Sequence, residues 1–137
     1  MDPETKMRVI KNSVLKLRKY GGWKIIKYID CVEYKFRSVP ETWIAETLSE
    51  YKISFEYETL SIPYIINDET HIYIPDFYLQ SYNLIIEFKG YNFFDEVTQN
   101  CKEYYTKKLG YEYILLMYKP KEQLILDIKQ IINRLSI

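Results

Sequence analysis

Several residue types that often carry enzyme chemistry are scarce in this sequence. It has one histidine, His71, and two cysteines, Cys31 and Cys101. The cysteines lie far apart and match neither a zinc-binding spacing nor a disulfide framework. A single histidine excludes a histidine-based metal site, and a Ser-His-Asp hydrolase would depend on His71 alone. We expect His71 to be a surface strand residue and both cysteines to be reduced thiols with a structural role.

Long apolar runs are also absent. The sequence has no run of about 18 or more apolar residues, which argues against a transmembrane helix. Its first residues have no apolar signal core, so we expect an intracellular protein without a membrane partner. The 137 residues, of which 47% are apolar and 17% aromatic, are enough to bury one sizeable core. Lysine outnumbers arginine, and Ile, Tyr and Asn are abundant, which is typical of an AT-rich genome such as that of a phage or mobile element.

The formal net charge is zero, but the charges are unevenly distributed. Residues 6–37 contain ten lysines and arginines against two acids, residues 38–100 contain two against eleven, and residues 101–137 contain seven against four. Local potential rather than total charge governs attraction to phosphate. An acidic middle with basic flanks therefore suits a site that holds a divalent cation next to a polyanion. Ordinary solvated charge is the alternative.

We predict an N-terminal arm, residues 1–35, and a core, residues 36–137. The arm is expected to contain a basic helix over 4–19, which ends at Gly21-Gly22, followed by one or two strands over 23–36. A surface rich in lysine and arginine favours contact with phosphates. The candidate side chains are Lys11, Lys16, Arg18, Lys19, Lys24 and Lys27.

The core is expected to be α/β, with a mixed central sheet and helices on both faces. Residues 83–90 and 111–118 are short, nearly continuous apolar runs, which is typical of strands covered on both faces. A helix between them predicts a parallel crossover. The full expected order is a helix over 38–51, a strand over 54–62, two strands around a turn at Asn67-Asp68, the strand 83–90, a helix over 95–109 ended by Gly110, the strand 111–118, and a helix after Pro120.

Polar residues fall at the ends of two successive predicted strands. Asp76 lies near the end of one, and Glu87 and Lys89 share one face of the next, just before Gly90. Neighbouring strands are about 4.8 Å apart, so the two carboxylates could meet at one cation, and Mg²⁺ prefers such oxygen ligands. Lys89 could then orient a water or stabilise charge on a phosphate. The alternatives are a turn residue at Asp76 and a surface ion pair, and the apolar neighbours of Glu87 disfavour the latter.

Glu41 is a further carboxylate candidate. On the predicted helix it shares a face with Ile44, Ala45 and Leu48, which should pack against the sheet. However, Ser38 and Glu41 also have the spacing of a capping box, in which the glutamate bonds back to the start of the helix. Spacing alone leaves both roles open.

Five short segments occur in order between residues 36 and 90: "FRSVPE", "FEYE", "IPY", "YIPDF" and "IIEFKG". Together they resemble the phage junction-resolving endonuclease I family of the PD-(D/E)XK nuclease superfamily. The resemblance implies a restriction-endonuclease-like αβββαβ core. It also implies an active site of Glu41, Asp76, Glu87 and Lys89, in which the three carboxylates bind Mg²⁺ and Mn²⁺ can substitute.

The resemblance implies a metal-dependent DNA endonuclease, most suited to branched DNA such as a four-way junction. Cutting two strands needs two sites, so we expect a homodimer, and we expect no small-molecule cofactor. Arg37 and Lys102 join the basic arm as candidate DNA contacts. Arg37 could equally pair with a neighbouring acid, and the alternative for Lys102 is a solvated helix face. One alternative is a sequence-specific duplex endonuclease of a mobile element or restriction system, which the long arm favours. Another is a non-catalytic DNA-binding protein on the same fold.

Overall fold

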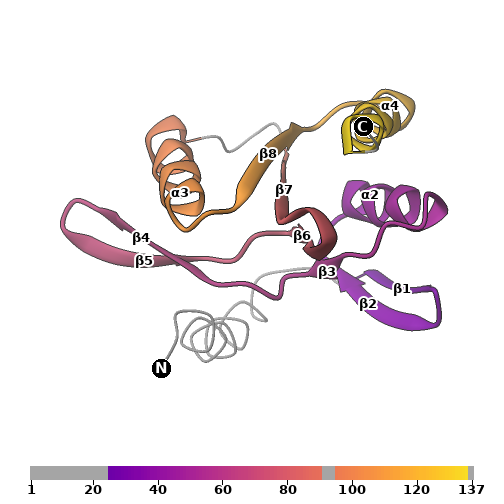
Figure 1. The fold of residues 1–137 in the computed structure, drawn as a ribbon, viewed down its shortest axis with the longest axis horizontal. Helices are drawn as coiled ribbons and strands as arrows, with labels where there is room; N and C mark the ends of the chain where they lie inside the picture. Colours follow the sequence, from indigo (N-terminus) through magenta and orange to yellow (C-terminus); the bar gives the residue numbers. More distant parts are fainter. Residues whose placement is uncertain (1–24, 91–94, 136–137) are drawn as a thin grey trace.

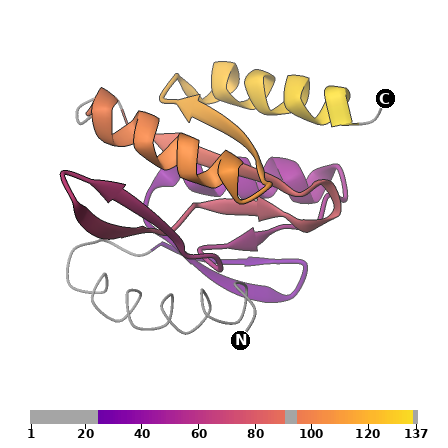
Figure 2. The same cartoon turned by 60° about the vertical axis from the view of Figure 1, so that its left-hand side comes forward.

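The computed structural model describes residues 25–90 and 95–135 (Figures 1 and 2). The predicted helix over 4–19 and the Gly21-Gly22 pair lie outside these residues. The strands are β1 (Ile25–Ile29), β2 (Val32–Phe36), β3 (Glu56–Tyr57), β4 (Ile62–Ile66), β5 (Glu69–Tyr73), β6 (Phe77–Leu79), β7 (Leu84–Lys89) and β8 (Glu112–Met117). The helices are α2 (Val39–Glu50), α3 (Glu96–Lys108) and α4 (Lys121–Leu135), with a 3₁₀ turn, η1 (Gln80–Tyr82).

The centre of the fold is a four-stranded sheet in the order β3-β6-β7-β8. β6 pairs antiparallel with both β3 and β7, whereas β8 runs parallel to β7 after the α3 crossover. The predicted mixed sheet and parallel crossover are therefore confirmed. β1–β2 and β4–β5 form separate two-stranded hairpins, and the second is inserted in the sequence between β3 and β6.

The two faces of the sheet are covered by different elements (Figure 1). Leu84 and Ile86 of β7 join the larger core cluster, which includes buried residues of α2 and α4. Ile85, between them, joins a smaller cluster with Tyr64 and Tyr73 of the β4–β5 hairpin, against α3. Because side chains alternate along a strand, Glu87 and Lys89 belong to the α3 face with Ile85.

Local chemistry explains where the helices begin and end. Ser38 caps α2, since its side chain accepts a hydrogen bond from the Glu41 backbone N–H. Asp95 caps α3 in the same way through the backbone N–H groups of Val97 and Thr98. Gly110 follows α3 with φ +98°, a left-handed conformation that favours glycine. These boundaries agree with the predicted ones.

Three strands differ from the prediction. β8 was expected to be covered on both faces, but it is the edge strand of the described sheet, and only Leu116 among its residues is buried. The strand expected over 54–62 is reduced to the two residues of β3, because Glu58 takes a positive φ of 54° and turns the chain out of the sheet. The strand expected after Asn67-Asp68 divides into β5 and β6 at Ile74 and Pro75. Proline has no N–H to donate to a ladder, so the chain leaves the hairpin there and enters the central sheet.

None of the helices in residues 25–90 and 95–135 has the length and apolar character of a membrane span. Both cysteines are free thiols, with Cys31 exposed in the β1–β2 turn and Cys101 half-buried. Ile29 and Phe36 of the β1–β2 hairpin belong to the larger core cluster. The division of the chain at residue 35 stays a prediction.

Candidate active site

Asp76 and Glu87 face each other across two adjacent chain segments. The β6–β7 register pairs Phe77 with Ile86, so the next pair along the antiparallel ladder is Asp76 with Glu87. Both side chains are buried, with relative exposures of 8% and 4%. The Asp76 N–H donates to Glu87 Oε1 at 3.2 Å, and the Phe88 N–H donates to Asp76 Oδ2 at 2.8 Å. Backbone groups thus fix both carboxylates on the α3 face of the sheet.

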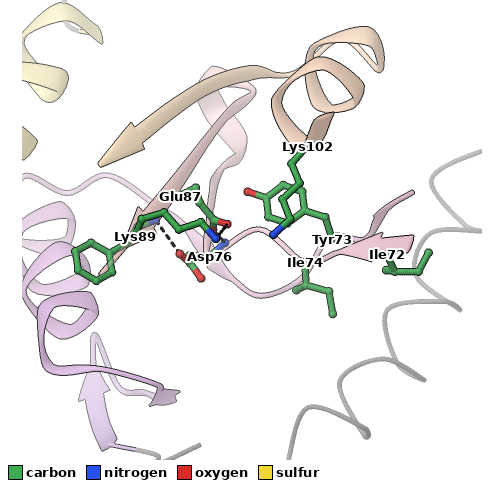
Figure 3. A pocket seen from close by; sticks show the side chains of 8 residues that line it. Ile72, Tyr73, Ile74, Asp76, Glu87, Lys89 and Lys102 are labelled. Carbon is green, nitrogen blue, oxygen red and sulfur yellow. Dashed lines mark hydrogen bonds and ion pairs between the residues drawn. The ribbon is translucent and has the colours of Figure 1, made fainter. Parts of the chain in front are cut away.

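The two carboxylates open into a pocket of about 430 Å³. Figure 3 shows the carboxylates beside Lys89, with Lys102 reaching in from α3. The walls are formed by β5, by the segment between β5 and β6, by β7 and by α3. The pocket therefore lies where the β4–β5 hairpin, the central sheet and α3 meet. The lining residues are Ile72, Tyr73, Ile74, Asp76, Glu87, Phe88, Lys89 and Lys102.

The electrostatics of this pocket favour a cation. Burial and the neighbouring charge of Glu87 raise the pKa of Asp76 well above its ordinary value, although the hydrogen bond from Phe88 acts in the opposite direction. Lys89 Nζ lies 4.0 Å from Glu87 Oε2, at the limit of an ion pair. Two buried like charges that face each other repel, and a positive ion between them would remove the repulsion.

Glu41 is buried nearby, but its oxygens already have protein partners. Ser38 Oγ donates to Glu41 Oε2 at 2.6 Å, and Tyr57 Oη donates to Glu41 Oε1 at 2.8 Å. Burial raises the pKa of Glu41 to about 7, and the charge of Asp76 adds to the increase. Glu41 therefore bonds back to its helix cap, as the capping role predicts, and its role as a metal ligand stays a prediction.

The carboxylate oxygens of the pocket suit a hard divalent cation that needs only a few protein ligands. Within the described parts of the chain, no group of three or more His, Cys, Asp or Glu side chains is arranged to hold a metal ion. Asp76 and Glu87 nevertheless offer two carboxylates on one wall of the pocket. Mg²⁺ is commonly held by one or two carboxylates together with waters and substrate phosphates. The predicted three-carboxylate site thus has two members side by side, with Glu41 held by Ser38 and Tyr57.

Glu58 is a buried acid of the cluster that the sequence reading did not identify. Its backbone N–H donates to the Asp76 carbonyl at 2.9 Å, which places it next to Asp76, just beyond the outer strand β3. Its carboxylate accepts from Arg37 Nε at 2.8 Å. Arg37, predicted as a DNA contact, is thus paired with an acid in the structure. The "FEYE" segment was the available signal, but the alternation alone did not show which glutamate turns inward.

A group of polar side chains, Tyr73, Gln99 and Tyr113, lies near Glu87, and the first two are buried. Gln99 Nε2 of α3 donates to Tyr113 Oη of β8. Gln99 Oε1 is buried without a hydrogen-bond partner among the described residues. Burial, followed by the charge of Glu87, raises the pKa of Tyr73 well above its ordinary value and raises the pKa of Tyr113 as well. No local sequence signal points to this group, since its members come from three separate elements.

Of the remaining predicted residues, Lys27 and His71 lie in the described part of the chain. Lys27 pairs with Glu46 at 3.4 Å on an exposed surface. His71 lies on β5, where its partly exposed side chain is 3.6 Å from Glu69, as expected of a surface strand residue. The other members of the predicted basic arm lie outside the described residues: Lys11, Lys16, Arg18, Lys19 and Lys24.

Comparison with known proteins identifies the family. The Phage endonuclease I family model matches residues 22–107, more than half of the chain and a range that includes the whole pocket. Endodeoxyribonuclease 1 of Enterobacteria phage T3 is 42% identical over 55 residues, and Endonuclease I of Escherichia phage T7 is 40% identical over 55 residues. Each alignment covers 40% of this chain and 36% of the relative. No solved structure gives a significant match. The chain belongs to the phage endonuclease I family.

Proposed function

We propose that this protein is a metal-dependent DNA endonuclease that hydrolyses phosphodiester bonds, with branched DNA such as a four-way junction as its preferred substrate. The observation that supports this function best is the buried pair of Asp76 and Glu87, with Lys89 beside it, in an open pocket of a phage endonuclease I family member. The T3 relative is named an endodeoxyribonuclease and the T7 relative an endonuclease. A protein that only binds DNA has no need of buried like charges, which cost stability.

Asp76 and Glu87 would hold Mg²⁺, or Mn²⁺ in its place. Such an ion polarises the phosphate and supplies a nucleophilic water at neutral pH. The Phe88 N–H fixes Asp76, and the Asp76 N–H fixes Glu87. The protein thereby positions these two ligands before substrate binds, which lowers the reorganisation needed during the reaction.

Lys89 would act directly on the reacting groups. Its ammonium lies 4.0 Å from Glu87 Oε2, on the same face of β7. In this position it can orient the attacking water and donate hydrogen bonds to the phosphate as negative charge increases. Glu41 is proposed as a third carboxylate of the site, which it can become by exchanging its bonds to Ser38 and Tyr57.

A homodimer would supply two such sites for two strands. The β1–β2 hairpin exposes Ile26, Tyr28 and Val32, and α4 exposes Leu126. These apolar side chains are candidates for the interface predicted near the N-terminus or at the last helix. Light scattering coupled to size-exclusion chromatography should give twice the chain mass of 16.7 kDa, and a single-chain mass would contradict the dimer.

The direct test is cleavage of a labelled four-way junction and a matched linear duplex, each with Mg²⁺ or EDTA. We expect Mg²⁺-dependent cutting of the junction by the wild type. Lys89→Ala should lower the rate by about 10²-fold or more, because it removes a group that acts in the transition state. Lys107→Ala is the matched control, since it removes an exposed lysine that pairs with Glu103 on α3, and it should cut normally.

The pattern of cutting separates the alternatives. Cutting of the linear duplex at discrete sequences, with no preference for the junction, would identify a sequence-specific endonuclease instead. Binding without cutting would indicate either a nuclease whose recognition sequence is absent or a non-catalytic protein. Absence of cutting also on long DNA of many sequences, at any Mg²⁺ or Mn²⁺ concentration, would falsify the endonuclease proposal.

A further inference from the structure

A second lysine enters the pocket from the wall formed by α3. Lys102 comes from this helix and lines the same pocket as Asp76, Glu87 and Lys89 (Figure 3). Its Nζ lies 5.1 Å from the centre of the Tyr73 ring. It also lies 5.9 Å from the centre of the Tyr64 ring. The faces of aromatic rings attract cations at this range, so two rings act together on one ammonium group.

The two rings provide a fixed support for Lys102. Tyr64 and Tyr73 are buried, at 8% and 3% exposure. The β4–β5 register pairs Ile62 with Tyr73 and Tyr64 with His71, so both tyrosines lie on one face of the hairpin, in the cluster that packs against α3. A long lysine side chain loses rotamer freedom when it is ordered. Contacts with both rings restrict the Lys102 side chain before substrate arrives.

Other lysines of α3 are placed differently. Lys108 Nζ lies 5.7 Å from the Tyr104 ring, but Tyr104 is 58% exposed and Lys108 does not line the pocket. Lys107 pairs with Glu103 on the solvent side. Lys108 therefore has a similar contact with an aromatic ring but lies outside the pocket, which makes it a matched control for Lys102.

The carboxylates of the pocket would repel a DNA phosphate. They belong to Asp76, the residue just before β6, and to Glu87 of β7. A bound divalent ion would offset their charge only in part. A phosphodiester carries one negative charge, and more negative charge develops on its oxygens as the water attacks. A second fixed cation on the α3 side would balance that charge from a direction other than that of Lys89.

We propose that Lys102 is a catalytic residue that contacts a non-bridging oxygen of the phosphate being cut, with Tyr64 and Tyr73 as its positioning residues. This inference rests on the proposed endonuclease function and names a further residue of the same site. A positively charged donor at this place can give a charge-assisted hydrogen bond to one phosphate oxygen.

The test compares Lys102→Met, Lys102→Arg and Lys108→Met. Methionine keeps much of the lysine stem and removes the charge, and thermal unfolding checks that each variant folds. The first readout is the single-turnover cleavage rate of the preferred DNA at saturating enzyme. The second is the Kd for the same DNA in EDTA, where nothing is cut.

We expect Lys102→Met to lower the saturated rate by roughly 10²-fold, as for loss of one transition-state donor. Its Kd should change less than about fivefold, because one phosphate contact contributes little to total DNA affinity. Lys102→Arg should recover most of the rate, and Lys108→Met should match the wild type. Tyr64→Leu should lower the rate roughly fivefold alone and not at all in the Lys102→Met background.

Several results would overturn the inference. One is a rate for Lys102→Met within about threefold of wild type, and another is an equal loss in Lys102→Arg. A loss seen only in Kd would make Lys102 an ordinary backbone contact. If the wild type cuts no DNA, the proposed function fails, and the assignment of Lys102 as a catalytic residue fails with it. Normal cutting by Lys102→Met beside an active wild type overturns the inference alone.

Discussion

Replacing Asp76 with asparagine should make the protein more stable when no divalent cation is present. Asp76 and Glu87 are buried and opposed on adjacent chain segments, so their charges repel in a poorly solvated place. The asparagine of the Asp76→Asn variant keeps an oxygen that can accept from the Phe88 N–H, as Asp76 Oδ2 does at 2.8 Å. Its new side-chain amide group can donate toward Glu87. The substitution thus turns a repulsion into an attraction without changing the shape of the side chain.

The size of the effect follows from the geometry of the sheet. Side chains directly opposite in an antiparallel pair have Cβ atoms about 5 Å apart. Two unit charges at about 5 Å and an effective dielectric constant of about 20 repel by roughly 3 kcal/mol. The wild type relieves part of this by protonation, since the pKa of Asp76 is raised. A gain of about 1–3 kcal/mol remains, which corresponds to a rise of roughly 3–9 °C in Tm for a domain of this size.

The assay is thermal and urea unfolding in EDTA at about pH 8, with Asp68→Asn as the control. Asp68 is an exposed turn residue, so removing its charge should change the free energy of unfolding by less than about 0.5 kcal/mol. Added Mg²⁺ should raise the Tm of the wild type through preferential binding to the folded state, and should not raise that of Asp76→Asn. A less stable Asp76→Asn protein in EDTA, or equal gains in the two variants, would refute the reasoning.

Three further predictions concern the acidic cluster. The folded-state pKa values of Glu41 and Asp76 are raised, so their contribution to stability is complete below about pH 4 and is lost as pH rises through the folded pKa. Urea unfolding in EDTA should therefore show a fall of roughly 3 kcal/mol in the free energy of unfolding from Glu41 alone as pH rises to about 7. A free energy of unfolding that does not change with pH would contradict this prediction. Arg37→Met and Glu58→Gln should show a coupling energy of about 1–3 kcal/mol in a double-mutant cycle, whereas additive losses would mean that their 2.8 Å contact contributes nothing. Tyr57→Phe removes the donor to Glu41 Oε1, so it should cost about 1–2 kcal/mol and move the pH dependence of stability to higher pH; an unchanged profile would argue against that bond.

Local signals predicted the described helices and the buried strand β7, because each boundary depends on neighbouring residues. They did not show that β8 lies at the edge of the sheet, because strand order depends on tertiary pairing. Ser38, Asp95 and Gly110 act within one turn of the helices that they begin or end. The apolar run of β7 was enough to place it inside the sheet. The strand over 54–62 was predicted too long, because the positive φ of Glu58 depends on its tertiary contacts with Asp76 and Arg37.

The same distinction applies to the site. Asp76, Glu87 and Lys89 could be grouped from the sequence, since alternation and adjacency of two successive strands are enough to bring them to one face. Whether Glu41 binds a cation, and whether Lys102 acts in the reaction, stay predictions. Gln99 and Tyr113 could not be found in this way, because their hydrogen bond forms only when α3 packs against β8.

The cost of the acidic cluster is itself an argument for a ligand. Four acids, Glu41, Glu58, Asp76 and Glu87, are all at most 8% exposed, and burial of an unpaired charge is strongly destabilising. Glu58 has its partner in Arg37, and Glu41 accepts two hydrogen bonds. Among the described residues, Asp76 and Glu87 are held by backbone donors and by a lysine at 4.0 Å. This most weakly compensated pair is the one that opens into the pocket, so a divalent cation bound there would supply the positive charge that the fold itself provides only at a distance.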